Sequence, residues 1–80
     1  MEGYFKTISN KDLADISKAS NVMTVGNIAN YPGSSNPVNQ AFVKYLETKK
    51  DIKNRSPFYQ VSEFINDMNY EIRKRFEALY

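Results

Sequence analysis

The sequence predicts an all-α fold of four helices in one small domain, residues 1–80. Two residue pairs, Asn36-Pro37 and Ser56-Pro57, each combine a good N-cap with a proline at the first helical position. Apolar residues follow both pairs at steps of three and four, and two shorter upstream segments have similar spacing. An apolar content of 41% is enough for one core but not for two. We therefore expect an arm (1–8), a unit of three helices (9–50) and a long C-terminal helix (56–80).

Two short helices are expected after the arm. Residues 4–8 alternate in polarity, but neither face is cleanly polar, so they are assigned to the arm. Ser9 stands three residues before Asp12, which is the spacing of a helix start. The polar stretch 18–21 separates the two helices, and turn residues 31–35 end the second one. The apolar positions are Leu13 and Ile16 in the first helix and Val22, Val25 and Ile28 in the second.

The third helix follows Asn36-Pro37, and its apolar pattern ends near residues 49–51. Its apolar positions, at helical spacing, are Val38, Ala41, Phe42, Tyr45 and Leu46.

The fourth helix carries a long apolar stripe made of Phe58, Val61, Ile65, Met68 and Ile72. If residues 57–80 are helical throughout, they span about 36 Å, more than the roughly 30 Å of a compact fold of this size. We therefore expect the stripe to be the self-association surface of a homodimer, in which Arg75 sets the register or reaches an acidic residue. The alternative is a helix that kinks and folds back on the domain.

The composition argues against most enzyme classes. The chain has no cysteine and no histidine, which excludes disulfides, thiolate nucleophiles, the usual zinc sites and the imidazole general base. Three carboxylates, Glu63, Asp67 and Glu71, follow one another at steps of four and could in principle hold Mg²⁺ or act as an acid–base pair. We interpret them as solvated helix surface. No catalytic residue, metal or cofactor is expected.

Neither a targeting segment nor a membrane span is evident. The chain opens without a basic start leading into a long apolar run, and no window approaches the roughly 20 apolar residues of a membrane helix. A cytoplasmic protein is expected. The net charge of +2 is too small to indicate a polyanionic partner by itself.

Two short helices, a loop and a third helix are the layout of a helix-turn-helix unit, which places its second helix in the major groove. Lys11-Asp12-Leu13-Ala14 and Thr24-Val25-Gly26-Asn27-Ile28-Ala29-Asn30 resemble two sequence runs in the DNA-binding head of the lac-repressor family. Those runs are Lys-Asp-Val-Ala and Thr-Val-Ser-x-Val-hydrophobic-Asn, and the resemblance covers residues 8–46. It implies a small regulator that binds double-stranded DNA sequence-specifically.

The expected DNA contacts fall into two groups. Thr24, Asn27 and Asn30 would meet the groove, and Asn27 could pair with an adenine edge. The cations expected to meet phosphates are Lys18, Lys49, Lys50 and Lys53. Lys49 and Lys50 also suit a helix C-terminus without any partner, because cations there are favoured by the helix dipole.

The alternative function is a helical protein-interaction module, such as a small inhibitor or adaptor, possibly phage-encoded, that offers a helix surface bearing tyrosine and phenylalanine to one protein target. Residues 1–43 contain three lysines and three acidic residues, so their net charge is zero. A DNA-facing surface normally gains much of its affinity from neutralising phosphates. An interaction module therefore explains this half of the chain better.

Overall fold

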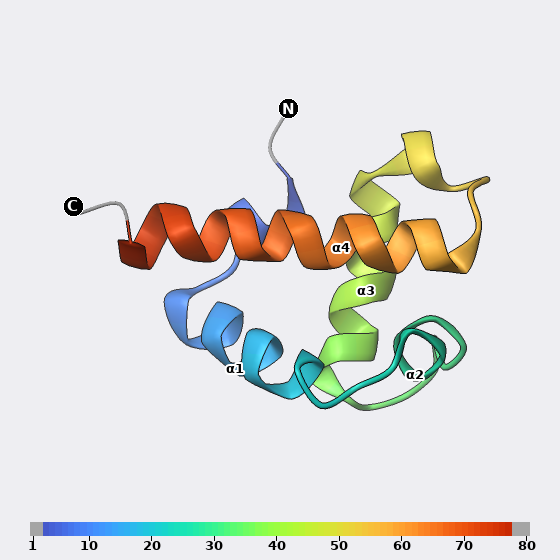
Figure 1. Cartoon of the computed structure of the whole chain (residues 1–80), viewed down its shortest axis with the longest axis horizontal. Helices are drawn as coiled ribbons and strands as arrows, with labels where there is room; N and C mark the ends of the chain where they lie inside the picture. The colour runs from blue at the N-terminus through green and yellow to red at the C-terminus, as the bar shows by residue number, and fades with distance from the viewer. Residues whose placement is uncertain (1–2, 78–80) are drawn as a thin grey trace.

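The computed structural model describes residues 3–77 and contains only helices and connecting turns there (Figure 1). Four α-helices follow one another as α1 (Asn10–Ser20), α2 (Val25–Ala29), α3 (Pro37–Thr48) and α4 (Pro57–Ile72). The last of them continues into a π-helical segment, η3 (Arg73–Glu77). Short 3-10 turns, η1 (Tyr4–Lys6) and η2 (Lys50–Ile52), lie before α1 and after α3. The expected all-α fold of four helices is confirmed.

Each α-helix begins where a polar side chain accepts a hydrogen bond from a backbone N–H of the first turn. The four caps are Ser9, Thr24, Asn36 and Ser56. Asn36 makes the shortest of these bonds, 2.8 Å from its Oδ1 to the nitrogen of Val38. The helix starts expected at Asn36-Pro37 and Ser56-Pro57 are therefore confirmed, because a cap is settled by residues only two or three positions apart.

The second helix is shorter than its apolar spacing predicts. Val22 lies in the connection before it and is 86% exposed, and α2 starts only after the cap Thr24. Asn30 forms the C-cap of α2, and the turn that follows contains Pro32 and Gly33. Only five residues remain helical between these two limits.

Residues 3–8, expected as part of an arm, pack against the body of the protein. Phe5 is buried, with its ring centroid 5.2 Å from that of Phe64 and 5.7 Å from that of Tyr45. Tyr4–Lys6 form a 3-10 turn rather than an extended chain. The N-terminal segment is therefore part of the core.

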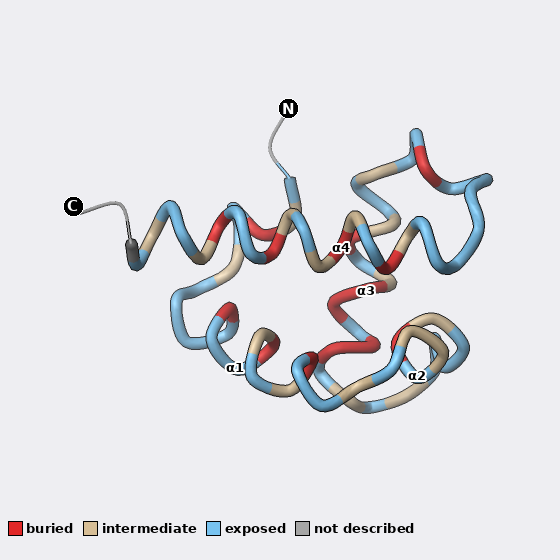
Figure 2. The backbone as a smooth tube through the Cα atoms, in the orientation of Figure 1, coloured by how far each residue is buried: buried red, intermediate tan, exposed pale blue. Residues whose placement is uncertain are grey.

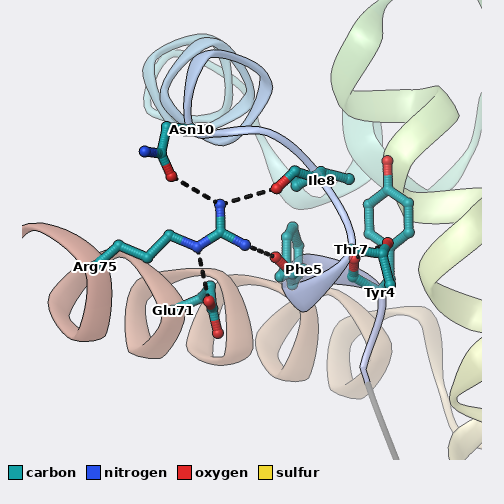
Figure 3. Close-up of polar contacts among 7 residues, drawn as sticks. All are labelled: Tyr4, Phe5, Thr7, Ile8, Asn10, Glu71 and Arg75. Atoms are coloured by element: carbon teal, nitrogen blue, oxygen red, sulfur yellow. Dashed lines mark hydrogen bonds and ion pairs between the residues drawn. The ribbon is translucent and has the colours of Figure 1, made fainter.

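A single guanidinium joins this segment to the C-terminal end of α4 (Figure 3). The Nε of Arg75 donates to Glu71 Oε2 at 2.8 Å, and its two terminal nitrogens donate to the carbonyl oxygens of Phe5 at 2.8 Å and Ile8 at 2.9 Å. One of them also donates to Asn10 Oδ1 at 3.1 Å. Arg75 was expected to act across a dimer seam; in the structure its polar contacts lie within one chain.

The core lies where α1, α3 and α4 face one another, which is where the buried segments gather in Figure 2. Phe64 is at its centre and makes ring contacts of 5.2 to 5.4 Å with Phe5, Phe42 and Tyr45. Other fully buried side chains come from α1, α3 and α4: Leu13, Val38 and Met68. Every buried side-chain nitrogen and oxygen within the described residues has a hydrogen-bond partner.

Much of the stripe assigned to self-association is covered by the chain itself. Val61 is 3% exposed and Met68 is 1% exposed, while Ile65 and Ile72 are half-buried against the core. Only Phe58, at 72%, is largely open to solvent. The helix lies along the 37 Å long axis of the molecule (Figure 1). The other three helices and the N-terminal segment all contact it and cover one side of it along most of its length.

Candidate functional site

The short helix α2 packs against both α3 and α4, and one buried amide on α3 also binds it. Asn39 is buried, and its Nδ2 donates to the carbonyl oxygens of Asn27 at 2.8 Å and Ile28 at 3.0 Å. A five-residue helix has few internal hydrogen bonds and is marginal alone, so these external bonds and the burial of Ile28 fix its position.

The three residues expected to meet a DNA groove lie on or beside α2, and all are exposed. Thr24 Oγ1 already accepts a hydrogen bond from the backbone nitrogen of Asn27 at 3.1 Å. The Nδ2 of Asn30 lies 3.5 Å from the position that a Cβ would occupy on Gly26, so this side chain lies against its own helix. Thr24 and Asn30 thus contact their own helix, and the Asn27 side chain is exposed on it.

The lysines expected to contact phosphates lie in separate places. Lys18 lies near the end of α1, in a shallow hollow that it shares with Ile72. Lys49, Lys50 and Lys53 follow the C-terminal end of α3, whereas α2 contacts α3 through Asn39 near the N-terminal end. The 12 residues of α3 span about 18 Å, so the structure does not bring these three lysines close to the polar residues on or beside α2. Figure 1 shows α2 and the turn after α3 on opposite sides of the molecule.

One of these lysines is engaged within the chain. The Nζ of Lys49 lies 3.9 Å from Asp67 Oδ2, and the side chains are 31% and 43% exposed. Asp67 also accepts a hydrogen bond from the hydroxyl of Tyr45. Burial of Tyr45 raises the pKa of its hydroxyl far above the ordinary value, and the bond to Asp67 and the nearby carboxylates raise it further. Tyr45 therefore stays protonated and acts as a hydrogen-bond donor.

The carboxylates of α4 are not the solvated ridge that the sequence suggests. Glu71 is 6% exposed and paired with Arg75, Asp67 is bonded to Tyr45, and Glu63 is half-buried. The solvated interpretation is wrong for Glu71, because the buried side of the helix is wider than the apolar stripe alone indicates. Among the residues that the structure describes, no group of three or more potential metal ligands lies close enough together to hold an ion.

The exposed side of α4 is uncharged instead. Apart from the first-turn Pro57, the exposed positions of this helix are Phe58, Tyr59, Ser62, Asn66, Asn69 and Tyr70, which we name the outer face of α4. Tyr59 and Tyr70 are about three turns apart at 3.6 residues per turn and so share one side. Figure 2 shows exposed residues recurring along α4. The stripe expected from the sequence shares only Phe58 with this face, and the other residues of the face lie between the stripe positions.

Cations stand at both ends of the outer face. The guanidinium carbon of Arg55 lies 5.3 Å from the centre of the Tyr59 ring, at the start of the helix. Arg73 and Lys74 are exposed just after its end. The outer face therefore has a neutral centre and a positive charge at each margin.

A hollow of about 770 Å³ opens beside the outer face. Its walls are η1, the end of α3 with η2, and α4. Its lining includes aromatic residues from three elements: Tyr4 and Phe5 from η1, Tyr45 from α3 and Tyr70 from α4. Tyr70 belongs both to this hollow and to the outer face of α4.

No known family model, curated protein or solved structure matches this chain significantly. Within the described residues, none of the helices combines the length and the apolar character that crossing a bilayer requires.

Proposed function

We propose that this chain is a non-catalytic protein-interaction module and that the outer face of α4 contacts its partner. One observation carries the proposal: the outer face of α4 contains no charged side chain. The solvent side of an amphipathic helix is normally rich in charged residues. A helix side made of tyrosine, phenylalanine, asparagine and serine instead resembles the composition of protein-binding surfaces.

The aromatic residues of this face suit recognition of a protein. Tyr70 is 65% exposed, and Phe58 and Tyr59 are also large and accessible. A tyrosine offers a large, amphipathic contact area and loses little side-chain entropy when it binds. Because these side chains stand on a helix that is packed against the core, their positions are largely set before the partner arrives.

The cations at the margins of the face favour a partner whose contact surface is acidic at its edges. Arg55 at one end, with Arg73 and Lys74 at the other, would meet carboxylates around a neutral centre. Charges at the rim of an interface mainly affect the association rate and specificity. Association should therefore slow as the salt concentration rises.

A pair of matched variants tests this function. Asn66→Arg places a charge at the centre of the outer face, and Gln40→Arg makes the same change at an exposed position of α3. Immobilised wild-type chain and both variants are used to capture proteins from an extract of the native host. We expect partners that bind the wild type and Gln40→Arg but lose at least tenfold of their binding to Asn66→Arg. Equal capture by all three chains would contradict the assignment of the outer face.

Sequence-specific binding of double-stranded DNA by a homodimer is the second candidate function. The specific observation in its favour is that Asn39 fixes α2 with Thr24 and Asn27 exposed beside it. Since α2 and the lysines after α3 lie at opposite ends of α3, the duplex would have to run along the exposed side of that helix. In this proposal Phe58 is the most accessible residue of the stripe for pairing two chains.

A salt titration with mixed duplex DNA tests the second candidate. A DNA-binding chain should lose affinity steeply as salt rises, because it releases counterions from the phosphates. Asn27→Ala should then cost about 1–3 kcal/mol on a preferred site if Asn27 reads a base. Absence of binding even at low salt would exclude this function, and sedimentation of the free chain reports on dimers separately.

A further inference from the structure

The hollow beside Tyr70 has a size typical of a ligand site. Its volume of about 770 Å³ lies within the range of roughly 300 to 1,000 Å³ found for clefts that bind small molecules, so a single aromatic side chain would fill part of it. We propose that it is an anchor site that receives an uncharged aromatic side chain. The identification of the protein partner as the carrier of this ring rests on the proposed function. The preference of the hollow for an aromatic ring is argued independently of it.

The charges inside the hollow are already paired. Asp67 accepts the hydrogen bond of the Tyr45 hydroxyl and lies 3.9 Å from the ammonium of Lys49. Glu71 is paired with Arg75 at 2.8 Å. An incoming cation would have to compete with these partners for the carboxylates.

The charges at the rim balance one another. Lys6 and Lys50 are exposed at the edge of the hollow, and so are Glu47 and Asp51. Two cations and two anions give no net preference for either sign. Neither a cationic nor an anionic ligand is therefore favoured, and an uncharged group suits the site better.

Two of the four aromatic residues that line the hollow, Tyr4 and Tyr70, are accessible to a ligand. Phe5 and Tyr45 are buried beneath the hollow, Tyr4 is half-buried in its wall, and Tyr70 is exposed at its edge. Aromatic rings attract one another in offset or edge-to-face arrangements in addition to burying apolar area. An aromatic side chain would thus gain ring contacts with Tyr4 and Tyr70 that an aliphatic one of equal size lacks.

The walls are held in place independently of any ligand. Arg75 fixes the N-terminal wall by donating to the carbonyl oxygens of Phe5 and Ile8 (Figure 3). Thr48 in the opposite wall donates its hydroxyl to the carbonyl oxygen of Tyr45. Because Tyr70 joins the hollow to the outer face of α4, a partner lying along that face could place one ring in the hollow.

The test uses simple probes and isotope-labelled full-length chain in solution. N-acetyl-phenylalanine amide is titrated while backbone amide signals are followed by NMR. N-acetyl-leucine amide, N-acetyl-arginine amide and N-acetyl-glutamate amide serve as comparisons. We expect saturable shifts at residues 3–6, 48–51 and 70 with the aromatic probe, and at least threefold weaker binding of each comparison probe. Equal binding of all four probes, tighter binding of a charged one, or no shifts at these residues would overturn the proposal.

Two tyrosine variants give a matched control. Tyr70→Ala removes the ring at the edge of the hollow, and Tyr31→Ala removes a comparably exposed ring that does not line it. We expect the first change to weaken binding of the aromatic probe at least fivefold and the second to leave it unchanged. Equal effects would contradict the anchor site. Asn66→Arg should weaken partner capture at least tenfold but leave probe binding intact, so a failure of the proposed function and a failure of this site give different results.

Discussion

Replacing Arg75 by alanine should destabilise the protein strongly, although the residue lies near the C-terminal end of the chain. The side chains of Arg75 and Glu71 are 18% and 8% exposed, so the pair is largely shielded from water. The substitution removes four hydrogen bonds and leaves the Glu71 carboxylate without its cation. The N-terminal segment also loses its polar attachment to α4.

The magnitude follows from the burial of the pair. Removing one partner of a buried ion pair costs about 3–5 kcal/mol, and we take the lower end, about 3 kcal/mol, because Arg75 is not fully buried. For a domain of this size, about 4 °C or more is lost per kcal/mol, so Tm should fall by roughly 12 °C or more. Urea unfolding followed by circular dichroism measures the free energy change directly.

Two comparison variants test whether the loss of stability comes from the broken contact between Arg75 and Glu71. Arg73→Ala, at an exposed neighbouring position, should change stability by less than about 0.5 kcal/mol. Adding Glu71→Gln to Arg75→Ala should restore part of the loss, because the buried charge is then removed along with its partner. A loss below about 1 kcal/mol for Arg75→Ala would refute the reasoning.

Three further changes test the core and the placement of α2. Tyr45→Phe should cost about 1 kcal/mol at neutral pH, since the partly exposed Asp67 can regain water. The pKa of Tyr45 is higher in the folded protein than in the unfolded chain, where it is near 10. The stability that this difference contributes is complete below about pH 10 and declines as the pH rises further. Chemical unfolding should therefore show a smaller loss of stability at alkaline pH in Tyr45→Phe than in the wild type. Asn39→Ala leaves two carbonyl groups of α2 unsatisfied and should cost about 1–3 kcal/mol, with faster amide exchange in α2. Phe64→Ala should cost about 3–5 kcal/mol in the same unfolding assay because the ring is fully buried.

Each of these expectations has an outcome that would contradict it. An unchanged alkaline profile in Tyr45→Phe would mean that another group causes the loss. Unaltered exchange in α2 after Asn39→Ala would show that apolar packing against α3 and α4 is enough to hold the helix. A cost below about 1.5 kcal/mol for Phe64→Ala would place the centre of the core elsewhere.

The residues of the candidate sites were only partly predictable. The exposed polar positions Thr24, Asn27 and Asn30 could be identified because turn residues and caps mark the limits of α2. Their separation from Lys49 and Lys50 could not, because it depends on α2 contacting α3 near its N-terminal end. The hollow was also unpredictable, since its lining comes from three segments that are distant in sequence.

The sequence by itself determined the number of helices and where α1, α3 and α4 begin. A capping bond such as that of Ser9 or Ser56 joins atoms only three residues apart, so nearby residues are enough to specify it. Only the tertiary structure decided which side of α4 is exposed, where the N-terminal segment packs and what Arg75 binds. Arg75 and Phe5 are separated by 70 residues, and their contact exists only because packing of apolar side chains brings both ends of the chain together.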